Sequence, residues 1–372
     1  MGDMKIESIE TIPVRVKLDR TYRGSYYNMP NRCTIVTRVR TSSGIVGEAY
    51  NADTDLEQDE ILTIIEREIT PSLLGENAFN FERNWQTMAK VTRDQLRDRR
   101  MAVQAIACVD TALWDAIGKA ADQPLHRLWG GYRDAIPMIG IGGYYEEPGM
   151  PSIEDEVESF LSDGMVGMKF KIGGRSPEVD AARLKRAVEV APDDWTFIVD
   201  ANQGYVFREA VQFVRLASEF VDLRWFEEPC RWPDDKIAMR DIRRTGVPVA
   251  AGQSEISHAG MRDLFTEGSI DVCNFDGSWG GGPTEWLRVA AAAMMFNVEL
   301  GHHEEPQLAS HLLASQPHST YVEAFHQERD PIFWQMLANR PTLTGGMFTL
   351  PTGPGLGWEL DAGFIAKHRV DR

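Results

Sequence analysis

The sequence predicts an α/β protein in which an N-terminal α+β capping domain precedes a (β/α)8-type, TIM-like barrel. Three observations indicate this fold. Eight short apolar runs alternate with helical segments after residue 131, and most of these runs end in or beside a titratable residue. The first 130 residues show a different order, with strands first and helices afterwards.

Residues 1–130 are expected to form the capping domain. Residues 4–18 and 33–50 alternate apolar and polar side chains, as strands do, and a polar, aromatic loop is expected from Arg20 to Asn31. From Asp59 to about Trp129, apolar residues recur at the spacing of one helix face.

Residues 131–344 are expected to form the barrel. Their apolar runs start about 20 to 30 residues apart, which is the length of one strand–helix–loop unit. An open, doubly wound sheet has the same local pattern, but eight strands are the number that closes into a filled barrel. Residues 345–372 contain no ninth unit and are expected to pack back on the capping domain. The runs are 136–141, 167–172, 196–199, 223–226, 247–250, 272–275, 298–301 and 320–322.

The composition indicates a globular protein and argues against nucleic acid or a membrane as its ligand. With 43% hydrophobic residues and a net charge of −17, the 372-residue chain is expected to be an acidic globular protein that binds neither nucleic acid nor an anionic membrane. Its four cysteines form no CxxC pair, and no signal-like or membrane-spanning run is evident. We therefore expect a cytoplasmic protein.

Titratable residues follow seven consecutive runs of the predicted barrel. A single polar residue there is usually a helix cap or part of a solvated loop, but caps would be Ser, Asn or Asp and would not sort into carboxylates, lysines and histidines. In a barrel these positions share the rim where catalytic groups lie. The titratable residues are Lys169, Lys171, Asp200, Glu227, Glu255, Asp276, His302, His303 and Glu323, and the polar Asn202 lies beside them.

Carboxylates on three successive runs indicate a divalent cation. Asp200, Glu227 and a group near Glu255 are 27 and 28 residues apart along the chain. Three converging carboxylates repel one another unless a cation lies between them. Oxygen ligands without Cys or His favour Mg²⁺ over Zn²⁺.

Two candidate bases flank this group. Strand alternation places Lys169 and Lys171 on one face, and Asp276 beside His303 is expected to fix the imidazole tautomer and raise its basicity. This layout suits abstraction of a proton next to a carboxylate, because the resulting enediolate needs strong positive charge nearby. The neighbouring cations are expected to lower the pKa of Lys171.

Most of the residues named above lie in the motifs KFK, VDANQGY, WFEEP and NFDGSWGGG. These motifs resemble the mandelate racemase/muconate lactonising branch of the enolase superfamily, in its mandelate racemase-like subgroup. A Lys or His base combined with Mg²⁺ is a known pattern of that superfamily. The resemblance covers nearly the whole chain, up to the closing GPGLGWEL. It is carried by AIACVDTALWDAIGKAADQPLHRLWGG, KFK, VDANQGY, WFEEP, NFDGSWGGG and HLLAS, in this order.

The resemblance implies roles for the residues around the metal. Asp200 and Glu227 match ligands of Mg²⁺, the implied cofactor. Lys171 matches the base of the KxK motif, and Lys169 matches the lysine that neutralises the substrate carboxylate and the enediolate. Asn202 lies close to the metal in many relatives.

The resemblance also implies a second acid–base group. Asp276 and His303 match an Asp–His dyad that works on the opposite face of the substrate, and His302 competes with His303 for this position. Glu323 matches a glutamate that hydrogen-bonds the developing enediolate oxygen. The implied partners are a small carboxylate substrate and further copies of the chain in a homo-oligomer.

Two positions depart from the family pattern. Relatives commonly carry the third metal ligand as a glutamate directly after glycine, and here that position is Gln253. Glu255 would face the same way on an extended segment, so we expect Glu255 to replace it, with the amide oxygen of Gln253 as the alternative. Trp279 is aromatic where some relatives have a lysine.

Several reactions remain open, because a fold does not fix a function. His303 would protonate a departing β-hydroxyl and so give a 2-keto-3-deoxy acid, whereas a substrate without a leaving group would be racemised or epimerised, and cycloisomerisation of a hydroxy acid is a further alternative. The polar loop favours a polyhydroxylated substrate, so we expect a lyase that dehydrates an aldonate or aldarate. A non-catalytic barrel is disfavoured, because both lysines and the dyad are intact. The expected substrate contacts are Arg23, Tyr26, Asn28, Tyr50, Asn202 and His302.

Overall fold

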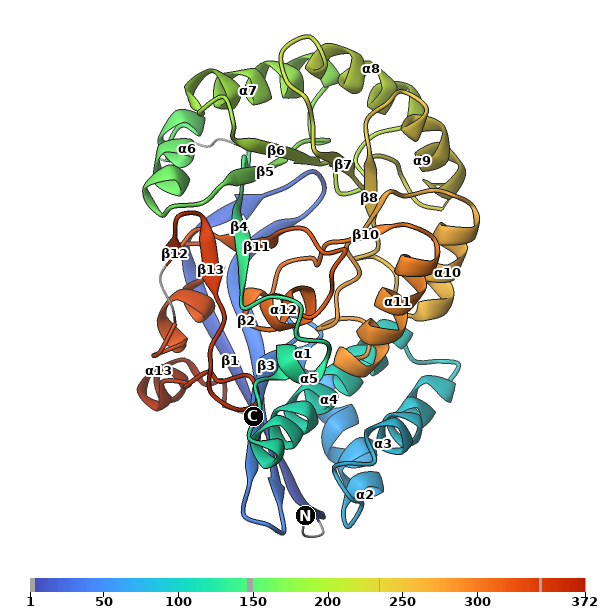
Figure 1. Ribbon diagram of the computed structural model, residues 1–372, viewed down its shortest axis with the longest axis vertical. Helices are drawn as coiled ribbons and strands as arrows, with labels where there is room; N and C mark the ends of the chain where they lie inside the picture. The colour runs from blue at the N-terminus through green and yellow to red at the C-terminus, as the bar shows by residue number, and fades with distance from the viewer. Residues whose placement is uncertain (1–3, 146–149, 234, 341–342, 372) are drawn as a thin grey trace.

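The strands between Ala135 and Phe325 close into a barrel of parallel strands (Figure 1). The computed structural model describes residues 4–145, 150–233, 235–340 and 343–371. Neighbouring strands pair in parallel from β4 to β10, and β11 pairs with β4. A bridge from Leu300 to Ser319, just before β11, completes the circle. The strands are β4 (Ala135–Gly142), β5 (Gly167–Lys171), β6 (Thr196–Asp200), β7 (Trp225–Glu227), β8 (Val249–Ala251), β9 (Val272–Cys273), β10 (Glu299–Leu300) and β11 (Val322–Phe325).

Helices form an outer layer around these strands (Figure 1). Helix α8, for example, buries an apolar stripe of Ala210, Phe213, Val214 and Ala217, which recur at helical spacing. The barrel interior is packed by its own cluster of Ile139, Ile198, Trp225, Ala250 and Val272, so the barrel has a solid core below its rim. The helices are α6 (Ile153–Ser162), α7 (Pro177–Val190), α8 (Phe207–Ala217), α9 (Asp235–Arg243), α10 (His258–Thr266), α11 (Pro283–Met295) and α12 (Pro306–Ala314), with a π-helix at Ile332–Met336.

The capping unit is an antiparallel three-stranded sheet followed by helices. Its central helix, α4, is the one helix among the described residues that is long and apolar enough to cross a membrane, but it is wholly buried against the sheet. Such burial is typical of a core helix in a globular unit. The elements are β1 (Ile6–Arg23), β2 (Asn28–Thr41), β3 (Val46–Asn51), α1 (Gln58–Ile64), a π-helix (Ile65–Ile69), α2 (Thr70–Leu73), α3 (Phe81–Met88), a 3₁₀-helix (Ala89–Arg93), α4 (Arg99–Ala121) and α5 (Leu125–Leu128).

The loop predicted from Arg20 to Asn31 is wrong, because strands β1 and β2 extend through most of it. The two strands pair as far as Arg23 with Asn28, so the turn is confined to residues 24–27. Tyr22 is buried against Tyr144 and other barrel residues, and the polar residues lie on the outward side of the same alternation. This long hairpin carries its tip to the barrel rim, where the Tyr145 N–H donates to the Arg23 carbonyl over 3.1 Å.

The C-terminal segment contacts both units. Strand β13 (Met347–Thr349) pairs with β12 (Leu343–Thr344) and with the first residues of β4 in the barrel. Further on, the Leu356 N–H donates to Asp115 of α4 over 2.7 Å, and α13 (Ala362–His368) packs on β1. The segment therefore ties the capping unit to the barrel.

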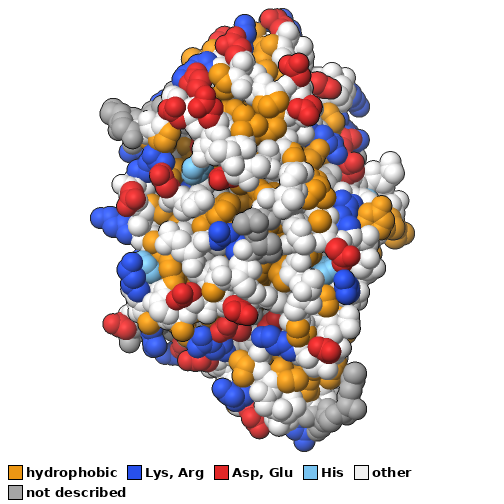
Figure 2. Space-filling view, turned by 60° about the vertical axis from the view of Figure 1, so that its left-hand side comes forward, with side chains coloured by type: hydrophobic (Ala, Val, Ile, Leu, Met, Phe, Trp, Pro, Cys, Tyr) orange, Lys and Arg blue, Asp and Glu red, His pale blue; other side chains and the backbone are white. Residues whose placement is uncertain are grey.

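The molecular surface carries charges of both signs. On the face shown in Figure 2, acidic and basic side chains are interspersed with apolar ones. A nucleic-acid surface needs clustered lysine and arginine side chains, and the described residues of this face do not form such a patch.

Candidate active site

Strand register places the predicted rim residues side by side. Lys171 of β5 is paired with Asp200 of β6, and Asp200 is paired with Glu227 of β7. All three end their strands and are at most 1% exposed. The structure thus brings together the two carboxylates and the lysines that the sequence singled out.

Both lysines are bound to carboxylates. The Lys169 amine donates to Glu227 over 3.0 Å and to Glu323 over 2.6 Å. The Lys171 amine donates to Asp200 over 2.7 Å and to the Asn202 side-chain oxygen over 3.2 Å. In the chain alone the lysines therefore neutralise the carboxylates.

The electrostatics of this cluster differ from the sequence-based expectation. Burial acts to lower the pKa of Lys171, but Asp200 outweighs burial, so the pKa lies well above its usual value. The predicted depression is wrong for the chain alone, since the adjacent carboxylate dominates. Burial raises the pKa of Glu227 to about 8, although Lys169 opposes this shift.

Glu255 does not join the cluster. It ends a turn in which its N–H donates to the Gly252 carbonyl over 3.0 Å, so residues two apart do not face the same way. Its carboxylate lies instead 3.7 Å from the Lys236 amine, on the outer side of the rim. The preference for Glu255 as third ligand assumed an extended segment, and the structure has a turn there.

Gln253, which follows Gly252 directly, lines the same cavity as Lys171. Its side-chain N–H donates to Glu228 over 2.9 Å, and Ser254 donates to the same carboxylate over 2.6 Å. Among the described residues the Gln253 Oε1 atom is buried and has no hydrogen-bond partner. Two carboxylates and an unused amide oxygen fit the oxygen donors that Mg²⁺ takes. The described residues hold no group of three His, Cys, Asp or Glu side chains placed to bind a metal.

His303 lies between two carboxylates. Its Nδ1 is 3.0 Å from Asp276 Oδ2, and its Nε2 is 3.0 Å from Glu304 Oε1. Burial acts to lower the pKa of His303, but Glu304 and Asp276 raise it well above its usual value. The imidazole is therefore held protonated, with an N–H on each side, while Trp279 packs against it with ring centroids 4.9 Å apart.

A cavity of about 240 Å³ joins these groups between the capping hairpin and the barrel rim. Lys171 and His303 both line it, although their strands, β5 and β10, are not neighbours in the barrel. It therefore brings a candidate base and a candidate acid to one enclosed space. Its walls are Tyr27, Met29, Asp53, Lys171, Asn202, Gln253, Trp279, His303, Glu304 and Arg329.

Of the six predicted substrate contacts, Asn202 lines this cavity. Arg23, Tyr26 and Asn28 line a neighbouring cavity of about 320 Å³ at the hairpin tip. The prediction treated the segment as an irregular loop, whereas strand pairing alternates its side chains and points Met29 into the site.

Tyr50 and His302 lie behind the cavity wall. Tyr50 is only 2% exposed and lies near Arg32, Glu305 and Asp330. The His302 Nε2 accepts from the Gly277 N–H over 2.9 Å, and its Nδ1 lies 2.9 Å from the His303 carbonyl. His302 therefore holds the backbone beside the dyad and does not face the cavity.

The sequence reasoning missed several cavity residues. Met29 carried a signal, since it alternates with polar neighbours at the start of β2, and Tyr27 stands two residues before it in the same alternation. Glu304 belongs to the unusual HHEEP run. Asp53 and Arg329 carried none, because each lies a few residues beyond a strand and reaches the cavity only through the fold.

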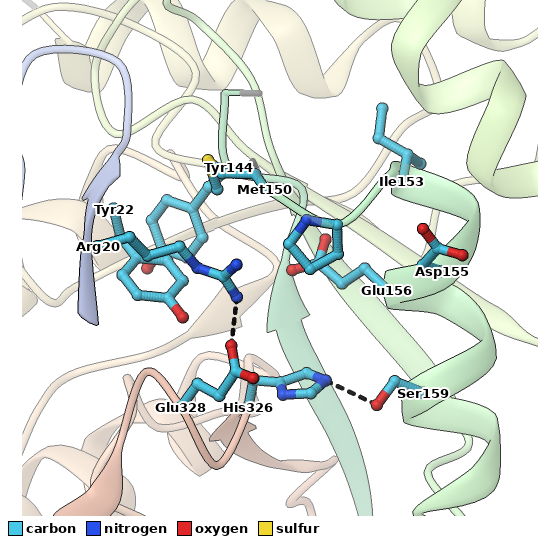
Figure 3. Close-up of a pocket in the computed structure, with 11 residues that line it drawn as sticks. Arg20, Tyr22, Tyr144, Met150, Ile153, Asp155, Glu156, Ser159, His326 and Glu328 are labelled. Carbon is cyan, nitrogen blue, oxygen red and sulfur yellow. Dashed lines mark hydrogen bonds and ion pairs between the residues drawn. The ribbon is translucent and has the colours of Figure 1, made fainter. Parts of the chain in front are cut away.

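A separate cavity of about 200 Å³ lies on the other side of Tyr22 and Tyr144 (Figure 3). Two pairs of its polar groups are bound to each other: Arg20 donates to Glu328 over 2.5 Å, and His326 lies 2.7 Å from the Ser159 hydroxyl. None of the rim lysines or carboxylates described above lines it, so we place the chemistry in the cavity between Lys171 and His303.

Known proteins match the chain over nearly its full length. Residues 8–130 match the family model described as mandelate racemase/muconate lactonizing enzyme, N-terminal domain, and residues 152–363 match the model described as enolase C-terminal domain-like. A crystal structure of a mandelate racemase/muconate lactonizing enzyme is 52% identical, with a TM-score of 0.97 over 99% of this chain and 100% of that chain. Another, from a marine actinobacterium in complex with magnesium, is 51% identical, with a TM-score of 0.93 and the same coverage.

Curated relatives are more distant. Arabinonate dehydratase of Saccharolobus solfataricus is 29% identical over 347 residues, which cover 90% of each chain. The 3,6-anhydro-alpha-L-galactonate cycloisomerase of Streptomyces coelicolor is 30% identical and covers 96% of this chain and 97% of its own length. L-talarate/galactarate dehydratase of Salmonella typhimurium is 26% identical, over 88% and 80%.

Proposed function

Because the chain belongs to the mandelate racemase/muconate lactonizing enzyme family of the enolase superfamily, we propose that it is a Mg²⁺-dependent acid-sugar dehydratase. One observation carries the proposal: a lysine and a histidine whose two ring nitrogens face carboxylates line the same small cavity, beside two buried carboxylates. Relatives named as dehydratases of arabinonate, talarate, galactarate and rhamnonate support the same chemistry.

Three side chains would hold the cation: Asp200, Glu227 and the amide oxygen of Gln253. When bound, Mg²⁺ supplies positive charge that stabilises an enediolate. Asp200 and Glu227 would then have to exchange the lysines for the cation, because Lys171 and Lys169 donate to these carboxylates in the chain alone. Lys171 would thereby be released from its partner.

In the proposed reaction, Lys171 would give up its extra proton once Asp200 no longer stabilises its charge, and the neutral amine then takes the proton from the carbon next to the substrate carboxylate. Lys169 donates to the enediolate oxygens, and Glu323, which is 2.6 Å from Lys169, would donate to one of them in its neutral form. His303 gives its Nε2 proton to the β-hydroxyl, which departs as water once the substrate has displaced Glu304 from that nitrogen. The enol then tautomerises to a 2-keto-3-deoxy acid.

Cycloisomerisation is the second candidate. It is favoured by two relatives named as cycloisomerases of sugar-derived substrates, one of them 30% identical. It uses the same base and the same acid and differs only in the leaving group, which remains part of the product. Racemisation is the third outcome of the same site and needs no leaving group.

The test is a screen of aldonic and aldaric acids for 2-keto acid formation in the presence of Mg²⁺, followed by variants. Lys171→Met is expected to abolish both dehydration and exchange of the C2 proton in D₂O. His303→Asn is expected to abolish dehydration and to leave exchange intact. Lys185→Met, on the exposed side of α7, is the control and should behave as wild type. Turnover that survives Lys171→Met would refute the assignment of the base.

The proposal includes a cytoplasmic homo-oligomer that acts on a small carboxylate. All four cysteines are free and buried, as is typical of proteins in a reducing compartment. Analytical ultracentrifugation of the purified protein checks the oligomeric state, and a purely monomeric species would contradict this part.

A further inference from the structure

Arg329 is a buried cation at the wall of the active-site cavity. It follows β11, is 2% exposed and lines the cavity of about 240 Å³. Its guanidinium carbon lies 4.3 Å from the Phe325 ring centroid and 5.7 Å from that of Tyr22. Among the described residues, its Nε and Nη1 atoms are buried and have no hydrogen-bond partner.

The neighbouring Arg32, in contrast, is a buried arginine whose charge is paired with carboxylates. Arg32 is also buried, at 1% exposed, and its guanidinium forms ion pairs with Asp53, Glu305 and Asp330. Buried guanidinium groups are normally paired in this way, because an unpaired buried charge is costly.

The carboxylates nearest to Arg329 are already engaged. Asp53 pairs with Arg32, and Glu304 pairs with His303. Both attract the Arg329 charge, but no hydrogen bond joins either of them to Arg329 among the described residues. The donors of Arg329 are therefore left for something that enters the cavity.

We propose that Arg329 is a specificity-determining residue that binds the second carboxylate of a diacid substrate, so that the preferred acid sugars are aldarates. This rests on the proposed function, in which the first carboxylate is held at Lys169 and the cation. A guanidinium presents several N–H donors in a plane that matches a carboxylate, and it carries the charge that a carboxylate neutralises. The hydroxymethyl end of an aldonate offers one neutral oxygen and leaves the charge unpaired.

The test compares matched acids that differ only at the far end, such as galactarate with galactonate and glucarate with gluconate. For wild type we expect kcat/KM to be roughly 10- to 100-fold higher for the diacid, the range of a charge-assisted hydrogen bond. Arg329→Met should remove most of this preference by lowering only the diacid value, whereas Arg329→Lys should keep part of it. Arg175→Met, an exposed arginine of the neighbouring cavity, is the control.

The outcomes separate this inference from the function on which it rests. If the enzyme dehydrates aldonates at least as well as aldarates, or if Arg329→Met lowers both equally, Arg329 only balances the nearby carboxylates and the inference is overturned. If no acid is turned over, thermal unfolding with Mg²⁺ and either tartrate or threonate gives an independent measurement. A larger rise in Tm with tartrate, lost in Arg329→Met but kept in Arg175→Met, supports the diacid site. Equal shifts overturn it.

Discussion

Gln253 leaves the proposed metal site with two carboxylates and one neutral oxygen ligand. Glu228 holds the amide by its N–H side over 2.9 Å, which leaves the buried amide oxygen without a hydrogen-bond partner among the described residues. A neutral ligand weakens the attraction for a divalent ion relative to a third carboxylate, so each remaining contact matters more.

We predict that Gln253→Ala weakens Mg²⁺ binding by about tenfold or more, by analogy with the loss of groups that orient metal ligands. Glu255→Gln is expected to change it by less than about twofold, because the Glu255 carboxylate pairs with Lys236 away from the site. Titration calorimetry with Mg²⁺ on both variants measures this directly. The reverse order of effects would restore Glu255 as the ligand.

At the scale of single elements, the long hairpin of β1 and β2 depends on an ion-pair cluster. Arg32 of β2 forms ion pairs with Glu305 at the start of α12 and with Asp330 beyond β11. Since the hairpin also supplies Tyr27 and Met29 to the cavity, this cluster fixes a wall of the site to the barrel.

Arg32→Met is expected to lower the free energy of unfolding by about 3–5 kcal/mol, because it leaves buried carboxylates without their cation. Arg15 lies on the adjacent strand, β1, and forms a more exposed ion pair with Asp55. Arg15→Met is expected to lower the free energy of unfolding by less than about 1 kcal/mol. Urea unfolding of the two variants provides the comparison. Equal losses would show that the cluster contributes no more than a surface ion pair.

The sequence predicted the elements whose signal is local. Apolar runs of strand length located the barrel strands, and strand alternation put Lys169 and Lys171 on one face. It failed where the outcome depends on backbone geometry between elements. The turn from Gly252 to Glu255 decides which side chain faces inward, and no periodicity marks such a turn.

Contacts that form only through the tertiary fold could not be predicted from the sequence either. Arg329 follows β11 and meets Tyr22 of β1, about 300 positions earlier in the chain. His303 and Asp276 were within reach, because each follows a strand of a recognisable repeat. Their contact could be predicted because both residues lie at the rim of the barrel. The cavity around them could not, because its wall also contains residues of the capping hairpin.

At the scale of the whole molecule, one buried histidine joins the three parts of the chain. His311 of α12 in the barrel lies 2.9 Å, through Nε2, from the Leu356 carbonyl of the C-terminal segment. Its Nδ1 accepts from the His126 N–H of α5 in the capping unit over 3.3 Å. The contact at Nδ1 requires the neutral imidazole, and the contact at Nε2 places its proton on Nε2.

This arrangement predicts a dependence of stability on pH. Burial lowers the pKa of His311 to about 3, whereas an unfolded histidine titrates near 6.5. Between these values the unfolded chain binds the additional proton. The stabilisation is therefore complete above about pH 6.5 and is lost as the pH falls toward 3.

From pH 7 to pH 5, this single group is expected to remove about 2 kcal/mol from the free energy of unfolding. His311→Gln keeps a donor and an acceptor but does not titrate, so its loss over this interval should be smaller than that of wild type by about this amount. Urea unfolding at pH 8, 7, 6 and 5 measures both proteins. The difference at pH 8 reports the altered hydrogen bonds, and the change in that difference with pH reports the titration. Parallel pH profiles would show that protonated His311 is tolerated in the fold, and that the three parts of the chain are not held together by a neutral imidazole.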